Sequence, residues 1–313
     1  MSGDIPIPSS ARPASDAKPG LRAIEPRRHL FCFGLGYSAL VLARQLAGSG
    51  WIVTGTCRNP QRAAELEAAG YPMRLFDRDR PLAAATLSEV SHILVSVPPD
   101  AAGDPVRECQ GEDIAALPAL VWFGYLSTTS VYGDRGGGWV DESSALRPNG
   151  ERGRRRAAAE AGWLDLWRRR GVPLHIFRLA AIYGPGRSPL DALRAGTARR
   201  VDKPGQVFSR IHVEDLARVL CASMSQPRPG AIYNVCDDDP APPEAVVAHA
   251  AELIGLRPPP LVPFADAGLS PLARSFYEDN KRVRNRLIKR DLGVSLRYPD
   301  YRAGLAAILA AEA

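Results

Sequence analysis

Apolar residues follow two alternating patterns along this chain. Two stretches, Ala39–Ala47 and Gln61–Ala69, place apolar residues at the spacing of an amphipathic helix. Seven short runs are instead typical of buried strands: Leu30–Phe33, Trp51–Thr56, Met73–Phe76, Ile93–Val97, Leu120–Ser127, Leu174–Ala180 and Ile232–Val235. Because strands and helices alternate through most of the chain, the pattern predicts an α/β fold, a parallel sheet with helices on both faces.

Composition narrows the class of protein. The 313 residues are 45% hydrophobic and 24% charged, as in ordinary globular proteins. No apolar stretch approaches the roughly 18 residues of a membrane helix. Residues 1–28 are rich in Pro, Ser, Ala and Arg and lack the apolar run of a signal peptide, so we expect a disordered tail.

Charge and cysteine content add two expectations. The net charge of +6 permits an anionic ligand but lacks the dense basic stripe of nucleic-acid binding. The five cysteines include no C-x-x-C pair, which fits a cytoplasmic protein without disulfides, and neither cysteines nor histidines form a metal-ligand motif.

A glycine-rich turn joins the first predicted strand to the first predicted helix. It reads G-L-G-Y-S-A and matches the dinucleotide fingerprint G-x-G-x-x-G/A. Gly34 permits the tight turn, Gly36 lets the backbone approach a pyrophosphate, and Ala39 permits close packing of the helix. The alternative is a turn without a ligand. The expected cofactor contacts here are Gly34, Gly36, Tyr37, Ser38 and Ala39.

Residues after the second and third strands bear on which dinucleotide binds. The second strand ends without the Asp or Glu that would hold the 2′-hydroxyl of NAD, and Arg58 follows it. A guanidinium there can pair with a 2′-phosphate, so NADP is favoured over NAD. Asp77 closes the third strand, where it could accept a hydrogen bond from adenine. The alternatives are a solvated Arg58 and a turn role for Asp77.

Four later segments resemble one known family. They lie in its order, and the resemblance covers residues 30 to 310: Ser127–Gly133 (S-T-T-S-V-Y-G), Phe177–Gly186 (F-R-L-A-A-I-Y-G-P-G), Arg210–Ala217 (R-I-H-V-E-D-L-A) and Ile232–Val235 (I-Y-N-V). Together with the glycine turn they are similar to the extended short-chain dehydrogenases/reductases, the NAD-dependent epimerase/dehydratase family.

The resemblance implies a Rossmann-type, doubly wound parallel sheet with a smaller C-terminal substrate lobe. We expect the Rossmann domain at 29–182 plus 205–235 and the lobe at 183–204 plus 236–313. It also implies a small-molecule substrate, which could be phosphorylated or nucleotide-linked, and a monomer or homodimer.

The family's catalytic residues match this chain only in part. Thr128 occupies its Ser/Thr position, but aligning on Ala157–Glu160 places Arg152 and Arg156 where the family has Tyr and Lys. A guanidinium keeps its protons, so Arg152 can donate hydrogen bonds but cannot shuttle a proton. The alternative is a solvated helix face on which Arg156 pairs with Glu160.

Tyrosines could replace the missing acid. Tyr132 and Tyr183 lie on segments that border the nicotinamide in the family, so we take Tyr132 as a candidate catalytic group and Tyr183 as a cofactor contact. A buried structural tyrosine is the alternative for both. The chain's only Tyr-x-x-x-Lys pair, Tyr277 and Lys281, lies outside the family's position, and we interpret it as chance.

Two functions remain open. The first is an atypical NADP-dependent oxidoreductase-like or epimerase-like enzyme. The second is a non-catalytic NADP-binding sensor or scaffold that kept the fold and lost turnover. Retained Thr128 favours the first, the lost Tyr-Lys pair favours the second, and the sequence leaves turnover undecided.

Overall fold

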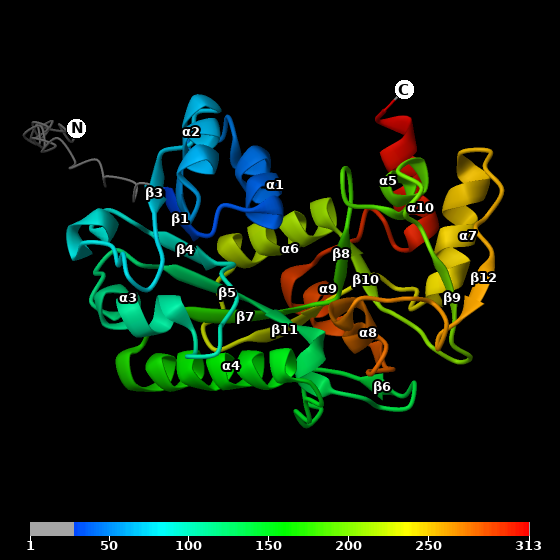
Figure 1. The fold of residues 1–313 in the computed structure, drawn as a ribbon. Helices are drawn as coiled ribbons and strands as arrows, with labels where there is room; N and C mark the ends of the chain where they lie inside the picture. The colour runs from blue at the N-terminus through cyan, green and yellow to red at the C-terminus, as the bar shows by residue number, and fades with distance from the viewer. Residues whose placement is uncertain (1–27, 313) are drawn as a thin grey trace, which may run out of the picture.

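A computed structural model describes residues 28–312, so the predicted tail lies outside the described residues except for Arg28. A seven-stranded sheet forms the centre (Figure 1), and all of its strand pairs are parallel. Its strands are β1 (His29–Phe33), β2 (Ile52–Cys57), β3 (Met73–Leu75), β4 (His92–Val95), β5 (Trp122–Thr128), β7 (Leu174–Leu179) and β11 (Ile232–Val235). All seven predicted strands are therefore present, with small shifts at their ends.

Helices cover both faces of this sheet, as a doubly wound fold requires. One face packs against α1 (Tyr37–Leu46), α2 (Pro60–Ala68), α6 (Val213–Ser225) and α9 (Arg286–Leu292). The other face packs against α3 (Pro105–Ala115) and α4 (Glu151–Arg170). Alternation along β1 explains the two cores, because Leu30 and Cys32 join the first and Phe31 and Phe33 join the second. The predicted Rossmann-type fold is confirmed.

The strand order locates a natural binding crevice. The order is β11-β7-β5-β4-β1-β2-β3, so the chain winds outward in opposite directions from β1 and β4. In open parallel sheets, ligands bind beyond the carboxyl ends of the strands at such a reversal. The glycine turn (Gly34–Ala39) follows β1 at this point, and Ser96 follows β4.

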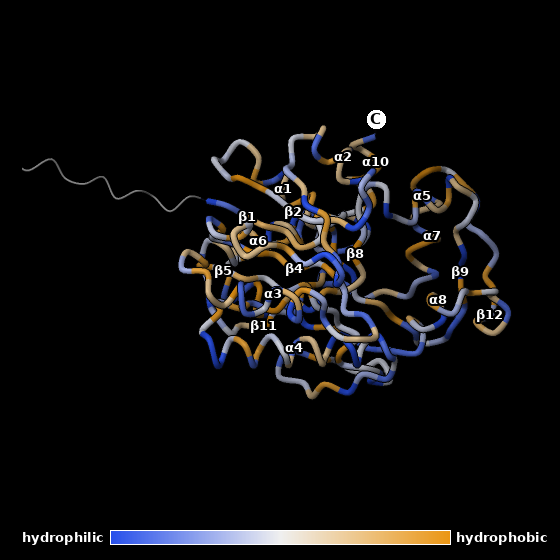
Figure 2. The backbone as a smooth tube through the Cα atoms, turned by 60° about the vertical axis from the view of Figure 1, so that its left-hand side comes forward, coloured by the Kyte–Doolittle hydropathy of each residue, from blue (hydrophilic) through white to orange (hydrophobic). Residues whose placement is uncertain are grey.

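A third apolar cluster lies outside the sheet. It packs Tyr183, α5 (Pro189–Arg194), α7 (Pro243–Leu253) and α10 (Tyr301–Ala310) together. Hydrophobic stretches in Figure 2 run through the strands and again through α5 and α7. A smaller group of elements therefore has its own core beside the sheet, while the exact domain boundaries stay a prediction.

Short elements connect the two parts. Three small parallel pairs join distant segments: β8 (Ala181–Tyr183) with β10 (Arg210–His212), β9 (Arg200–Asp202) with β12 (Leu261–Pro263), and β6 (Trp139–Val140) with β13 (Arg282–Val283). The remaining elements are η1 (Ala84–Leu87), η2 (Thr129–Tyr132) and α8 (Pro271–Phe276). Among residues 28–312, no helix is both long and apolar enough to span a membrane.

Candidate functional site

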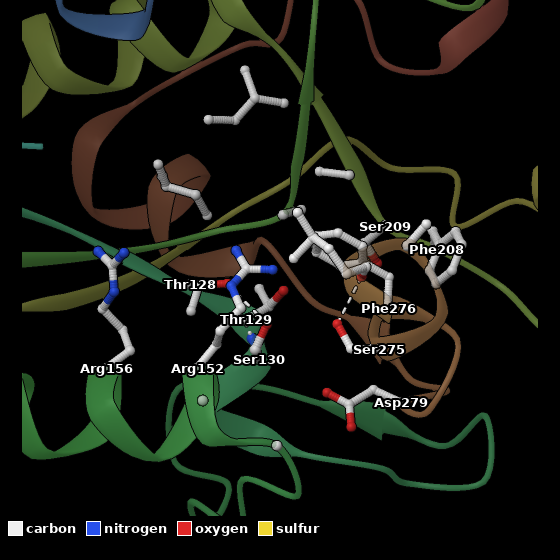
Figure 3. Close-up of a pocket in the computed structure, with 18 of the residues that line it drawn as sticks. Thr128, Thr129, Ser130, Arg152, Arg156, Phe208, Ser209, Ser275, Phe276 and Asp279 are labelled. Carbon is white, nitrogen blue, oxygen red and sulfur yellow. Dashed lines mark hydrogen bonds between the residues drawn. The ribbon is translucent and has the colours of Figure 1, made fainter. Parts of the chain in front are cut away.

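A cavity of about 1000 Å³ opens beyond the carboxyl ends of the strands. Its lining begins at the glycine turn, passes the end of β5 and the first turns of α4, and reaches α8. The cavity therefore includes the crevice that the strand order marks. Figure 3 shows its α4 side, with Arg152 and Arg156 extending from the helix and Ser275 and Phe276 facing them.

The glycine turn is held tightly at its first residue. Gly34 has φ +86°, and an added Cβ would lie 2.7 Å from the Ser96 hydroxyl. Its N–H donates to Thr56 Oγ1 at 2.9 Å, and its carbonyl accepts from Ser96 Oγ at 2.6 Å. These contacts fix the turn at the junction of β1, β2 and β4, where glycine is required.

The second glycine of the turn faces open space. A Cβ at Gly36 would have no atom within 4 Å, and Gly36, Tyr37 and Ser38 all line the cavity. Backbone N–H groups at the start of α1 therefore border a space able to receive an anionic group. Ala39 is buried in the core against the sheet, so its role is the close packing of α1. The residues present thus fit a dinucleotide pyrophosphate.

Tyr37 ties this turn to the segment after β8. Its hydroxyl donates to the Pro185 carbonyl at 3.1 Å, and the Arg187 guanidinium lies 5.6 Å from its ring centre. Burial raises the pKa of Tyr37 to about 12. Arg187 also lines the cavity and has no carboxylate partner within the described residues. Arg187 is not among the residues predicted from the sequence, although it directly follows the Y-G-P-G segment.

Arg58 and Asp77 lie at the ends of β2 and β3, apart from the residues that line the cavity. Arg58 is exposed, and its side chain forms no ion pair among residues 28–312. Asp77 accepts from Arg80 Nε at 2.9 Å, and this hydrogen bond lowers the pKa of Asp77. The structure therefore leaves Arg58 available to a ligand, whereas Asp77 is engaged with Arg80.

Hydroxyl groups gather where β5 ends. Thr128 is half-buried and caps the N-terminus of η2: its Oγ1 accepts from the Ser130 N–H at 3.3 Å and lies 3.1 Å from Ser130 Oγ. Thr128, Thr129 and Ser130 all line the cavity. The parallel strand ends here, so its last side chains reach the cavity.

The first turns of α4 bring Arg152 and Arg156 to these hydroxyls. Gly153 permits the close approach, because a Cβ there would lie 2.8 Å from the Ser130 carbonyl oxygen. Arg152 Cζ lies 4.9 Å from the ring centre of Phe276, while Arg156 donates to the Leu126 carbonyl. Partial burial and the nearby Arg156 charge lower the pKa of Arg152. The structure thus brings Thr128, Arg152 and Arg156 together.

The alternative interpretation, in which Arg156 pairs with Glu160, is wrong. Glu160 instead accepts from Arg178 of β7 at 2.8 Å, and both side chains are almost fully buried. The i,i+4 rule fails here because a buried arginine on the neighbouring strand satisfies the carboxylate better than a cavity-facing one. Glu151, at the start of the helix, pairs with Arg154 at 3.0 Å and with Arg155 at 2.9 Å. Only half of the arginine cluster is therefore a solvated face.

The structure does not bring Tyr132 or Tyr183 to the cavity. Tyr132 is fully buried, donates to Asn234 Oδ1 at 2.7 Å and accepts from Arg178 at 2.9 Å, and burial raises its pKa to about 12. The Tyr183 hydroxyl donates to the Asp300 carbonyl at 3.3 Å within the third apolar cluster. Both hydroxyls are committed to the interior, so we do not carry Tyr132 forward as an acid.

Tyr277 and Lys281, by contrast, do line the cavity. The Tyr277 ring lies 5.2 Å from Phe208 between ring centres, and burial raises its pKa. Lys281 donates to Asp279 at 2.9 Å, and burial lowers its pKa. The two residues do not share a helix, because α8 ends at Phe276. Their spacing is therefore not that of the family's helical pair, and only the folding back of this segment places them here.

Comparisons with known proteins agree with this architecture. Residues 115–236 match the NAD dependent epimerase/dehydratase family. Protein YeeZ of Escherichia coli is 28% identical over 282 residues, which cover 85% of this chain and 95% of that protein.

Solved structures extend the likeness to the whole described fold. A conserved protein from Silicibacter pomeroyi, described as functionally unknown, is 54% identical, with a TM-score of 0.84 over 90% of this chain and 98% of its own. A UDP-glucuronic acid 4-epimerase from Bacillus cereus, in complex with UDP-glucuronic acid and NAD, shares the fold at 15% identity, with a TM-score of 0.72 over 90% and 97% of the two chains. Residues 115–236 thus match the NAD-dependent epimerase/dehydratase family, and the motif order and fold agree with the extended short-chain dehydrogenases/reductases that the sequence resembles.

Proposed function

We propose that this chain binds a nicotinamide dinucleotide along the glycine turn and a small molecule in the adjoining α4–α8 part of the cavity. The observation that carries the proposal is Gly36, whose missing side chain opens the start of α1 to the cavity. The Bacillus cereus epimerase of the same fold is in complex with NAD, which supports this class of cofactor. Arg187, stacked on Tyr37, would add a positive charge near the pyrophosphate.

The substitution Gly36→Val tests the site itself. Two methyl groups would enter the space that the pyrophosphate needs, without meeting any protein atom close to the Cβ. We expect the variant to keep the melting temperature of the wild type and to lose binding of NADPH and NADH in a fluorescence titration. Unchanged affinity would mean that the glycines serve only the turn.

We propose further that NADP is preferred over NAD. Strand β2 ends in Thr56-Cys57 and is followed by the exposed, unpaired Arg58, so no carboxylate there repels a 2′-phosphate. Arg58→Ala should weaken NADPH binding by about tenfold and leave NADH binding nearly unchanged. The matched control is Arg62→Ala, an exposed arginine already paired with Glu65. Equal or tighter binding of NADH by the wild type would contradict the preference.

The chain's own groups define what chemistry the site could support. When bound, the nicotinamide would supply reversible hydride transfer. Thr128 can donate one hydrogen bond and Arg152 a charge-assisted one to a substrate oxygen that gains negative charge. Loss of one such donor commonly lowers the rate by about 10²–10³. Thr128→Ala should therefore lower kcat with little change in NADPH affinity.

A second candidate, an NADP-binding sensor or scaffold without turnover, rests on the same arginines. Neither Arg152 nor Arg156 can exchange a proton near neutral pH, and Tyr132 lies buried away from them. The double variant Arg152→Tyr with Arg156→Lys restores the family's pair. A gain of dehydrogenase activity would support the sensor, while loss of an existing activity would support an enzyme that uses the arginines.

A further inference from the structure

Four arginines in the first turns of α4 fall into two groups. Arg154 and Arg155 point to solvent and share Glu151, whereas Arg152 and Arg156 face the cavity. Positions four apart lie on the same side of a helix, so Arg152 and Arg156 face the cavity about one helical turn apart. Neither member forms an ion pair with a carboxylate among residues 28–312.

Of the three carboxylates that line the cavity, Glu151, Glu278 and Asp279, two are already engaged. Glu151 pairs with the two solvent-facing arginines. Asp279 accepts from Lys281 at 2.9 Å and from Asn149 at 3.2 Å. Meanwhile Arg156 opposes the charge on Arg152. An arginine without an ion-pair partner beside a second arginine favours a bound anion, and a guanidinium can bind an oxyanion through two parallel hydrogen bonds.

The wall opposite Arg152 carries several large apolar side chains. Leu272 and Phe276 of α8 both line the cavity, yet their side chains remain 57% and 46% exposed, respectively. Val207 and Phe208 continue this wall, and Phe276 is the ring against which Arg152 stacks (Figure 3). Large apolar side chains left exposed inside a cavity are suited to cover an apolar body.

We propose that the α4–α8 end of the cavity binds a small organic oxyanion, a carboxylate or phosphate monoester, carried on an apolar body. The acid group would sit on Arg152, whose five N–H donors leave one for the reacting oxygen beside Thr128. The body would lie against Leu272 and Phe276. This inference rests on the proposed function, because it names the substrate class of the same cavity.

The test uses the full chain and three probes that share a phenyl ring, of which the propanoate and the propanamide are matched in shape. Isothermal titration with 3-phenylpropanoate, phenyl phosphate and neutral 3-phenylpropanamide is performed with and without saturating NADPH. We expect one or both anions to bind at least tenfold more tightly than the amide. A preference between the two anions identifies carboxylate or phosphate as the natural acid group. Equal binding of the amide, or no binding of either anion, would overturn the proposal.

Matched variants assign the effect to Arg152. Arg152→Gln should weaken the binding of the anions at least tenfold. The same substitution at the solvent-facing position, Arg154→Gln, should leave their binding unchanged. If Arg152→Gln instead weakens NADPH and spares the anions, Arg152 serves the cofactor and the proposal is wrong. The proposed function fails in a different measurement, in which the wild type binds neither NADPH nor NADH.

Discussion

Two arginines beside α4 meet opposite surroundings. Arg178, on β7, is buried beneath the helix and is fully compensated, by Glu160 and by Tyr132. Arg152, on the helix itself, faces the cavity, stacks on the ring of Phe276 and forms no ion pair among residues 28–312. An arginine cannot escape burial by losing its proton, so it needs a partner from the protein or from a ligand. The difference separates a charge that serves the fold from one that is free to serve binding.

The largest effect should follow from breaking the compensated pair. Glu160→Gln leaves the buried Arg178 charge without its carboxylate, which we expect to lower the free energy of unfolding by about 3–5 kcal/mol. Urea unfolding followed by circular dichroism measures the change. The double variant Glu160→Gln with Arg178→Met should lose less than the sum of the single variants. If Glu160→Gln lowers the free energy of unfolding by less than about 1 kcal/mol, Arg178 is no more important to stability than Arg152, and the distinction between them is wrong.

Histidine offers another way to tolerate burial, because it can lose its proton. His92 and His175 are buried, and burial lowers the pKa of each to about 4. The nearby Arg28 charge also lowers the pKa of His92. The unfolded chain, with histidine pKa values near about 6.5, binds more protons between pH 4 and 6.5. Stability is therefore complete above about pH 6.5 and falls as the pH drops toward 4.

The size of this loss follows from the two shifts. At about 1.4 kcal/mol per pKa unit, each histidine could remove up to about 3 kcal/mol by pH 4. Unfolding free energies measured across this range test the slope, and the ring proton resonances of His92 and His175 test its source. Resonances that titrate near pH 6.5 would assign the slope to other groups.

The cavity arginine should matter far less to stability. Arg152→Ala removes one ring contact but also the repulsion by Arg156. A contact of this kind at an exposed site contributes about 0.5–1 kcal/mol, so we expect the unfolding free energy to change by no more than about 1 kcal/mol. Binding of anionic probes should nonetheless fall. A destabilisation as large as that of Glu160→Gln would show that Arg152 is structural.

Local patterns predicted most of the sheet and the glycine turn. Buried parallel strands show as continuous apolar runs, and the turn shows as glycines at fixed spacing directly after such a run. The same local reasoning placed Arg152 and Arg156 four residues apart on one helix. These features depend on neighbours in sequence, which is why the sequence alone could reveal them.

The missed features depend on contacts between distant segments. Glu160 pairs with Arg178 because α4 packs over β7, a choice that the i,i+4 rule cannot anticipate. Tyr132 turns into the interior because the short helix η2 directs its hydroxyl to Asn234, 102 residues away. Phe276 faces α4 because its segment folds back to pair β13 with β6. No local signal encodes those encounters.

The smallest effect belongs to the solvent face of α4. Glu151 is fully exposed and pairs with Arg154 and Arg155, which lowers the pKa of Glu151. Exposed ion pairs contribute little because water and salt screen them. Glu151→Gln should therefore shift the urea midpoint only slightly at low salt and not at all at high salt. It should leave binding at Arg152 intact, since the freed arginines point away from the cavity. The opposite outcome is that Glu151→Gln gains affinity for the anionic probes and that adding Arg154→Gln removes this gain. In that case the freed arginines reach the cavity, and the solvent-facing and cavity-facing arginines of α4 are not separate groups.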